Sequence, residues 1–168
     1  MSNPIATFEK VSLEEFKLSC KSTYYCMDDA VIEDVWNNIK LPARGTAGSA
    51  GYDFYLPLGF FMMKNKPVVI PTGIRAKIEP GWFLMILPRS GLGFRYGARL
   101  VNTAGIIDSD YYNAANEGHI MIKFDADDTW PLTTDTRFAQ GIFIPYGTAT
   151  NDETLKEERS GGFGSTGA

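Results

Sequence analysis

The chain has 168 residues, of which 44% are hydrophobic and 21% charged, and its formal net charge is −4. This length suits one domain with one sizeable core, and the acidic balance argues against a general nucleic-acid-binding protein. No apolar run is long enough to span a membrane and the N-terminus lacks a signal-peptide pattern, so we expect a cytoplasmic protein with no membrane partner. Cys20 and Cys26 are then expected to be reduced thiols. An anionic substrate is still possible, because a few arginines can be focused in one site.

The first 40 residues differ from the rest and are interpreted as an N-terminal extension of short helices. Ser12 and Glu15 have capping-box spacing, which predicts one helix start. Asp28 and Asp29 mark a second candidate start. The apolar side of this second helix would consist of Val31, Ile32, Val35 and Trp36.

From residue 50 onward, short apolar segments alternate with Gly and Pro turns. We predict strands at residues 52–56, 68–70, 74–78, 82–87, 119–124 and 138–144. The run 82–87 is continuously apolar, which predicts a fully buried strand. Strands at such short intervals indicate an all-β sandwich, barrel or jelly roll.

The last ten residues, 159–168, are rich in glycine and hydroxyl side chains. Glycines let backbone N–H groups converge on phosphate oxygens. Arg159, Ser165 and Thr166 can add donors to the same anion, and Phe163 can stack on a flat base. The same composition also fits a disordered Gly/Ser tail.

Two upstream segments indicate chemistry on a phosphorylated compound. Directly after the apolar run 82–87, Arg89, Ser90 and Gly91 would form a turn that cradles an anion. Residues 102–111 place acidic side chains beside Ile106 and Ile107, so a carboxylate there could act as a general base. The alternative is that these acids merely belong to a turn.

Five segments in order, residues 47–54, 88–92, 102–111, 137–142 and 159–168, resemble the five motifs of the homotrimeric dUTPase family. The resemblance implies a distorted jelly roll over residues 41–158, preceded by the helical extension 1–40. It also implies a flexible arm, 159–168, that closes over active sites shared within a homotrimer. The family hydrolyses dUTP to dUMP and pyrophosphate by water attack at the α-phosphorus. This reaction keeps uracil out of DNA and supplies dUMP for thymidylate synthesis.

The resemblance assigns the catalytic and nucleoside-binding roles. Asp108 matches the general base, and Tyr111 matches the tyrosine that packs against deoxyribose and leaves no room for a 2′-hydroxyl. The uracil-binding segment would contain Asn102, Gly105, Ile106, Ile107 and Met121. Backbone groups in this hairpin would meet the Watson–Crick edge of uracil and exclude thymine and cytosine.

The resemblance also assigns the residues that face the triphosphate. They are Arg89, Ser90, Gly91 and Gln140 in the body of the chain, and Arg159, Gly164, Ser165 and Thr166 in the tail, where Phe163 would cover the uracil. Asp53 is expected to orient Arg89 or a metal-bound water, and Arg137 is either a site residue or a structural ion pair. The family uses Mg²⁺ on the triphosphate, and no residue here is expected to ligate the ion directly.

Two features depart from the family pattern. Residues 112–117 lie between Tyr111 and Gly118, where the family pattern has one residue, and a surface loop can absorb this insertion of about five residues. The tail has one residue fewer than usual between Arg159 and the Gly-Gly-Phe segment.

Two alternatives stay open at this point. A dCTP deaminase shares the fold but acts on the base, and the segment 108–111 with a full tail favours dUTPase. A dUTPase-like protein could instead use nucleotide occupancy as a switch for a protein partner. The extension and the insertion leave surface for such a partner, but nothing in the sequence identifies one.

Overall fold

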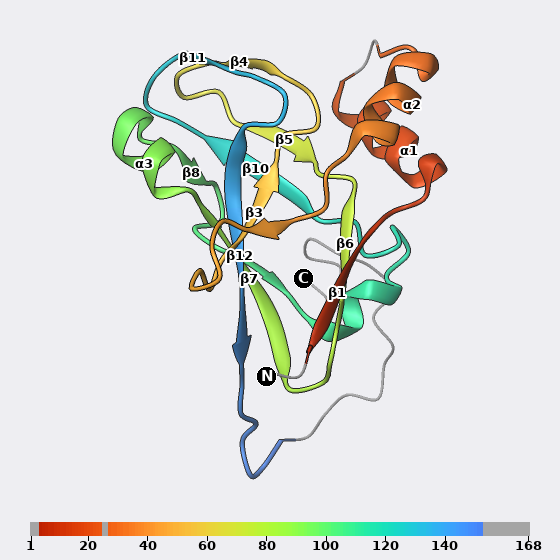
Figure 1. Ribbon diagram of the computed structural model, residues 1–168, viewed down its shortest axis with the longest axis vertical. Helices are drawn as coiled ribbons and strands as arrows, with labels where there is room; N and C mark the ends of the chain where they lie inside the picture. The colour runs from red at the N-terminus through yellow and green to blue at the C-terminus, as the bar shows by residue number, and fades with distance from the viewer. Residues whose placement is uncertain (1–3, 25–26, 153–168) are drawn as a thin grey trace.

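The computed structural model describes residues 4–24 and 27–152. Short strands dominate this part of the chain, which confirms the all-β fold class (Figure 1). The strands are β1 Ala6–Lys10, β2 Ala43–Arg44, β3 Tyr52–Tyr55, β4 Phe60–Met62, β5 Val68–Pro71, β6 Ile74–Ile78, β7 Trp82–Pro88, β8 Arg99–Leu100, β9 Gly105–Ile107, β10 Met121–Asp125, β11 Trp130–Leu132 and β12 Arg137–Pro145. The helices are α1 Leu13–Thr23, α2 Asp29–Asn38, α3 Ser90–Tyr96 and the 3₁₀ helix η1 Ser109–Asn113.

The strands pair in antiparallel sheets, of which the largest has the order β2-β3-β12-β7-β9. A second sheet has the order β5-β10-β8, and β1 with β6 and β4 with β11 form two-stranded ribbons. The large sheet positions two of the expected motifs. β7 ends directly before Arg89, and β9 ends directly before Asp108. No helix within residues 4–24 and 27–152 is long and apolar enough to cross a membrane.

The expectation that residues 82–87 are fully buried is wrong for this chain. Burial alternates along β7: Leu84 and Ile86 are buried, whereas Met85 and Leu87 are partly exposed. Successive side chains of a strand point to opposite faces of the sheet, and only one face of β7 packs on the core.

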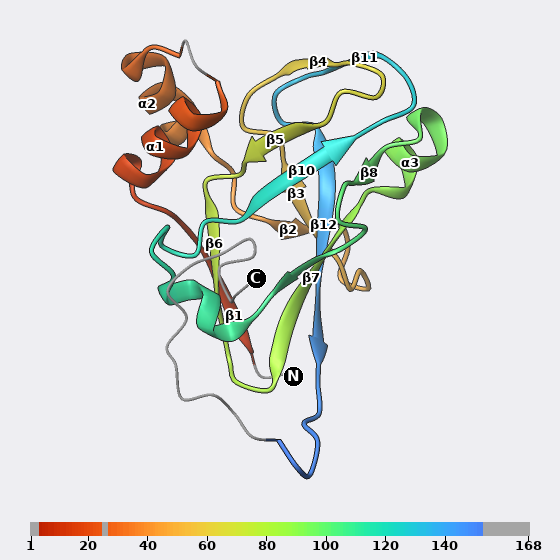
Figure 2. The same ribbon diagram turned by 180° about the vertical axis from the view of Figure 1, so that it is seen from behind.

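The N-terminal segment shares the core of the β domain. β1, which was not predicted from the sequence, pairs with β6 along its whole length. α1 and α2 pack on each other, and α1 also contacts β5 (Figures 1 and 2). Phe16 and Ile32 are fully buried there, and the indole N–H of Trp36 donates to the carbonyl of Val11 at 3.0 Å.

The apolar side of α2 differs from the predicted one at a single position. Ile32 is buried, and Val35 and Trp36 pack against the core, but Val31 is 49% exposed. Residues 32, 35 and 36 follow the i, i+3, i+4 spacing of one helix face, and Val31 lies at the edge of that face.

The start of α1 has only half of the predicted capping box. The Ser12 hydroxyl accepts the N–H of Glu15 at 3.1 Å, as expected for an N-cap. In a full box the Glu15 carboxylate would accept the N–H of Ser12. Here that N–H donates at 2.7 Å to Glu117, which also accepts the Ser12 hydroxyl at 2.6 Å. The residue that completes the cap therefore comes from the insertion after Tyr111.

His119 lies at the centre of the contacts between α1 and the β domain. Its ring is fully buried, and Nε2 accepts the N–H of Gly73 at 2.8 Å. The proton of the neutral ring is therefore on Nδ1, 3.0 Å from Ser19 Oγ and 3.2 Å from Glu15 Oε1. Gly73 has φ +70°, and an added Cβ would lie 2.2 Å from Ile39 Cδ1, so only glycine fits this turn. Burial lowers the pKa of His119 to about 4.

Acid should destabilise the protein through His119. Between pH 6.5 and about pH 4 the unfolded chain binds a proton at this ring that the folded chain excludes. Stability present above pH 6.5 is therefore lost as the pH falls toward 4, by about 3 kcal/mol for this one group. Urea titrations across this pH range measure the loss, and His119→Asn should flatten the profile. Because the chain has one histidine, its ring proton gives a single NMR signal, and ordinary titration of that signal near neutrality would contradict the prediction.

Candidate active site

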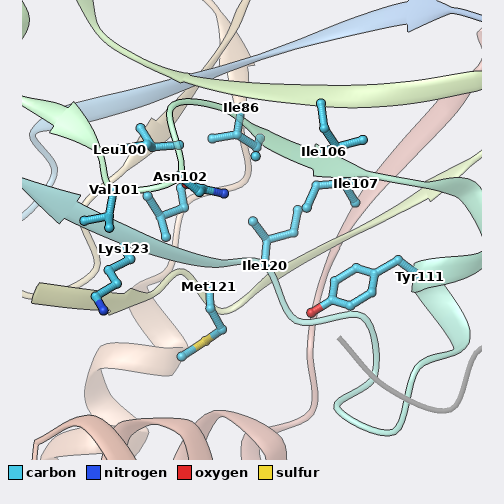
Figure 3. Close-up of a pocket in the computed structure, with 12 residues that line it drawn as sticks. Ile86, Leu100, Val101, Asn102, Ile106, Ile107, Tyr111, Ile120, Met121 and Lys123 are labelled. Carbon is cyan, nitrogen blue, oxygen red and sulfur yellow. The ribbon is translucent and has the colours of Figure 1, made fainter. Parts of the chain in front are cut away.

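An apolar pocket of about 340 Å³ lies between β7, β9 and β10 (Figure 3). It is lined by Ile86, Leu100, Val101, Asn102, Gly105, Ile106, Ile107, Tyr111, Ile120, Met121, Ile122 and Lys123. All the residues in the body of the chain that were expected to hold the nucleoside are among them. In Figure 3 the amide of Asn102 and the ring of Tyr111 approach the hollow from different sides, and the amine of Lys123 points away from it. An apolar hollow of this size with few polar groups is typical of a small-molecule site.

The sequence analysis missed several of the lining residues. They are Ile86, Leu100, Val101, Ile120, Ile122 and Lys123. They belong to β7, β8 and β10 or directly adjoin β8 and β10. No local motif marks them, and their apolar character alone does not separate pocket residues from core residues.

β9 and η1 together place Asp108 and Tyr111. β9 pairs with β7, with Ile107 opposite Leu84, and the chain then turns into η1. Asp108 is the residue before η1, and its carbonyl accepts the N–H of Tyr111 at 3.2 Å. The two residues are thus one turn apart, with Asp108 half-buried at the end of β9 and Tyr111 on the wall of the pocket.

Tyr111 is held at its hydroxyl. The side chain is 4% exposed, and its O–H donates to the carbonyl of His119 at 2.9 Å. The same oxygen accepts from the amide nitrogen of Asn116 at 2.9 Å. These contacts leave the ring itself as the part of Tyr111 that meets the pocket.

A second hollow, of about 310 Å³, contains Arg89 and Gly91, two of the residues expected to bind phosphate. It is lined by Arg89, Gly91, Leu92, Arg95, Tyr96, Thr136 and Arg137. Three of these side chains are arginines, and Ser90 is exposed beside them at the start of α3. The predicted Arg-Ser-Gly turn is corrected here, because residues 90–96 continue as a helix that ends at Gly97 in a left-handed conformation.

Asp53 joins two of the arginines. Its carboxylate is 7% exposed and forms ion pairs with Arg89 and, at 3.2 Å, with Arg137. The orientation of Arg89 by Asp53 that we expected is therefore present, and Arg137 forms the ion pair that was one of its two alternatives. The backbone of β3 sets this geometry, since Asp53 pairs in register with Gln140 of β12.

Gln140 lies beside the first motif. Its amide nitrogen donates to the carbonyl of Pro88 at 3.5 Å, a long hydrogen bond at the end of β7. An added Cβ at Gly51 would lie 2.8 Å from the Gln140 side-chain oxygen, so motif residues 47–54 and 137–142 are in close contact.

The nucleoside pocket and the phosphate-side hollow have no lining residue in common. Figures 1 and 2 show why: α3 and η1 lie on opposite flanks of the large sheet. The expected tail residues Arg159, Phe163, Gly164, Ser165 and Thr166 lie outside the described residues. The structure thus groups the expected site residues of the body of the chain into two separate sets.

Comparison with known proteins identifies the family. A family model described as dUTPase matches residues 37–167. A deoxyuridine 5′-triphosphate nucleotidohydrolase of Lactococcus lactis is 40% identical over 134 residues, which cover 77% of this chain and 89% of that protein. One of Paraburkholderia xenovorans is 36% identical over 148 residues, covering 83% and 97%. The crystal structure of dUTPase from Streptococcus mutans matches with a TM-score of 0.63 at 29% identity, covering 86% of this chain and 98% of that one.

The chain belongs to the dUTPase family. Of the two enzymes that the sequence left open, this membership favours dUTPase over dCTP deaminase.

Asp53→Asn should lower the free energy of unfolding by about 2 kcal/mol, because two arginines lose a shared, buried charged partner. Arg137→Gln removes one half-exposed arm of the same cluster and should cost less than about 1 kcal/mol. Urea denaturation of both variants measures the difference. An equal loss of unfolding free energy in the two variants would show that the burial of Asp53 does not add to the stability of the cluster.

Proposed function

We propose that the chain hydrolyses dUTP to dUMP and pyrophosphate, with water attacking the α-phosphorus. The observation that carries the proposal is the apolar pocket lined by Asn102 and Tyr111, with Asp108 one turn before Tyr111, in a member of the dUTPase family. The proposed biological role is to keep uracil out of DNA and to supply dUMP for thymidylate synthesis. The cytoplasmic location expected from the sequence remains part of this proposal.

Asp108 is the proposed general base. Its position after β9, at the start of η1, fixes the backbone that carries the carboxylate. A carboxylate held in this way can take the proton of the attacking water as the bond to phosphorus forms. Arg89, with the hydroxyl of Ser90 beside it, would balance the charge that builds on the leaving pyrophosphate.

Base and sugar selection would both arise in the pocket of Figure 3. The segment from Asn102 to Ile107 and the start of β10 at Met121 supply backbone groups on two sides of the hollow. Such groups can pair with the edge of uracil, and a wrong base would leave them unpaired at a cost. The ring of Tyr111 would pack on deoxyribose and exclude a 2′-hydroxyl.

Mg²⁺ is proposed from family membership, with the triphosphate and water as its ligands. Within the part of the chain that the structure describes, no three His, Cys, Asp or Glu side chains gather in a cluster that could hold a metal ion. We therefore assign no residue to the ion. When bound to the triphosphate it would neutralise charge and fix the conformation of the phosphate chain.

We also propose that the protein is a homotrimer with shared active sites. One support is the separation of the nucleoside pocket from the phosphate-side hollow within one chain. A second is an apolar row on the outer face of the large sheet. Met85 pairs with Ile106 on one side and Ile142 on the other, and none of the three is buried. Apolar surface of this kind is typical of subunit interfaces.

Asp108→Asn should abolish turnover while leaving dUTP binding intact. The amide keeps the shape of the side chain but loses its basicity, so kcat should fall by about 10²- to 10⁴-fold. Pyrophosphate release with Mg²⁺ measures turnover, and calorimetry with dUTP measures binding. Asp110→Asn, the control, also removes one negative charge, two residues later. Its kcat should stay at least about ten times higher than that of Asp108→Asn. Turnover near wild type in the Asp108 variant would exclude this residue as the base.

The shared site can be tested by mixing two inactive proteins. One carries Asp108→Asn with an intact tail, and the other keeps Asp108 but ends at residue 158. If the tail of one subunit closes over a neighbour, co-refolded trimers should regain activity, because some sites then combine an intact Asp108 with an intact tail.

Light scattering and differently tagged chains would establish that mixed trimers form. Mixed trimers with no more activity than the separate variants would mean that the tail serves its own subunit or is not needed.

A further inference from the structure

The insertion after Tyr111 is packed into the protein rather than carried as a surface loop. Ala114 is 5% exposed, and the hydroxyl of Tyr112 donates to Glu9 in β1 at 2.8 Å. Gly118 closes the segment at φ +71°, where an added Cβ would lie 2.7 Å from the carbonyl oxygen of Tyr111. The expectation of a loop that merely absorbs extra residues is therefore corrected, and each inserted side chain needs its own explanation.

Asn116 is the inserted residue that contacts the pocket wall. Its amide nitrogen donates to the hydroxyl oxygen of Tyr111 at 2.9 Å and to the carbonyl of His119 at 3.2 Å. The Asn116 side-chain oxygen is buried and has no hydrogen-bond partner among the described residues. A buried, unpaired oxygen is unfavourable, so this side chain is not explained by its own stability. Its NH₂ group carries both contacts.

Three hydrogen bonds join the hydroxyl of Tyr111, the amide nitrogen of Asn116 and the carbonyl of His119. That hydroxyl gives its hydrogen to the carbonyl of His119 and needs a donor for its lone pair, which Asn116 supplies. Because Asn116 also donates to the same His119 carbonyl, the three groups fix one another. The tyrosine ring can then neither slide along nor tilt out of the pocket wall without breaking two bonds at once.

We propose that Asn116 is a positioning residue that sets the sugar selectivity of the pocket by holding the ring of Tyr111. The inference rests on the proposed role of Tyr111 in excluding the 2′-hydroxyl. Steric exclusion works only if the excluding group cannot retreat, and a ring held at its hydroxyl meets this requirement. Loss of the Asn116 side chain should therefore raise kcat/KM for UTP by more than it lowers kcat/KM for dUTP.

The test compares kcat/KM for dUTP and for UTP in Asn116→Leu, which keeps the size of the side chain and removes the donor. The ratio of dUTP to UTP should fall by about five- to tenfold, mainly through a lower KM for UTP. A ratio does not depend on the fraction of folded enzyme, so general destabilisation leaves it unchanged. Asn116→Ala provides a second variant in case leucine does not fit.

Asn113→Leu is the matched control, because Asn113 is exposed and belongs to η1 at the start of the same insertion. It should keep the wild-type ratio.

Tyr111→Phe retains the ring and removes the hydroxyl, so adding Asn116→Leu to Tyr111→Phe should change the ratio by less than about twofold.

Two results would overturn the inference in distinguishable ways. If Tyr111→Ala lowers the ratio but both Asn116 variants keep it, Tyr111 selects the sugar without help from Asn116. If Tyr111→Ala itself keeps the wild-type ratio, the proposed role of Tyr111 fails and the role of Asn116 fails with it.

Discussion

The protein depends on one buried, neutral imidazole that holds three parts of the chain in register. The ring of His119 accepts the N–H of Gly73 in the turn between β5 and β6 and contacts Ser19 of α1. Its backbone carbonyl accepts the hydroxyl of Tyr111 on the pocket wall. A charged ring could not make this set of contacts, because Nε2 must accept a hydrogen bond, and burial keeps the ring neutral by lowering its pKa to about 4. The turn, the first helix and the nucleoside pocket thus share one anchor that carries no charge at neutral pH.

The parts of the site that could be predicted from the sequence are those set by local chain geometry. Family resemblance assigned Asp108 and Tyr111 their roles, and because the two are three residues apart, a single turn of η1 is enough to bring them together. The Asp53–Arg89 pair was also expected through family resemblance, but it joins two distant segments, which the registers of β12 against β3 and against β7 bring together. β1 was missed since its partner β6 lies far along the chain. α3 was missed because Gly91 and Gly93 give its sequence the composition of a turn.

The division of the site into two hollows follows from how each half is built. Uracil and deoxyribose need an apolar wall with a few fixed polar groups, which β7, β9 and β10 provide around a single cavity. A triphosphate needs cations that stay in place, and Asp53 holds two arginines by burying its carboxylate between them. In the homotrimer that we propose, one chain would supply the pocket and a neighbour the arginines, and the apolar row on the outer face of the large sheet would be covered.

The N-terminal extension and the insertion after Tyr111 are physically one feature. The family model begins at residue 37, so residues 4–36 precede it, and residues 112–117 lie between the segments 102–111 and 137–142 that resemble the family motifs. In the folded chain they bind each other: Glu117 completes the cap of α1 at Ser12, and Tyr112 contacts Glu9, which in turn pairs with Arg75 of β6. Burial alone would raise the pKa of Glu117, but the hydrogen bonds from Ser12 outweigh it, so the pKa is lowered and the carboxylate stays charged at neutral pH. Neither segment would keep these partners without the other, which argues that the N-terminal extension supports the hairpin that carries Tyr111.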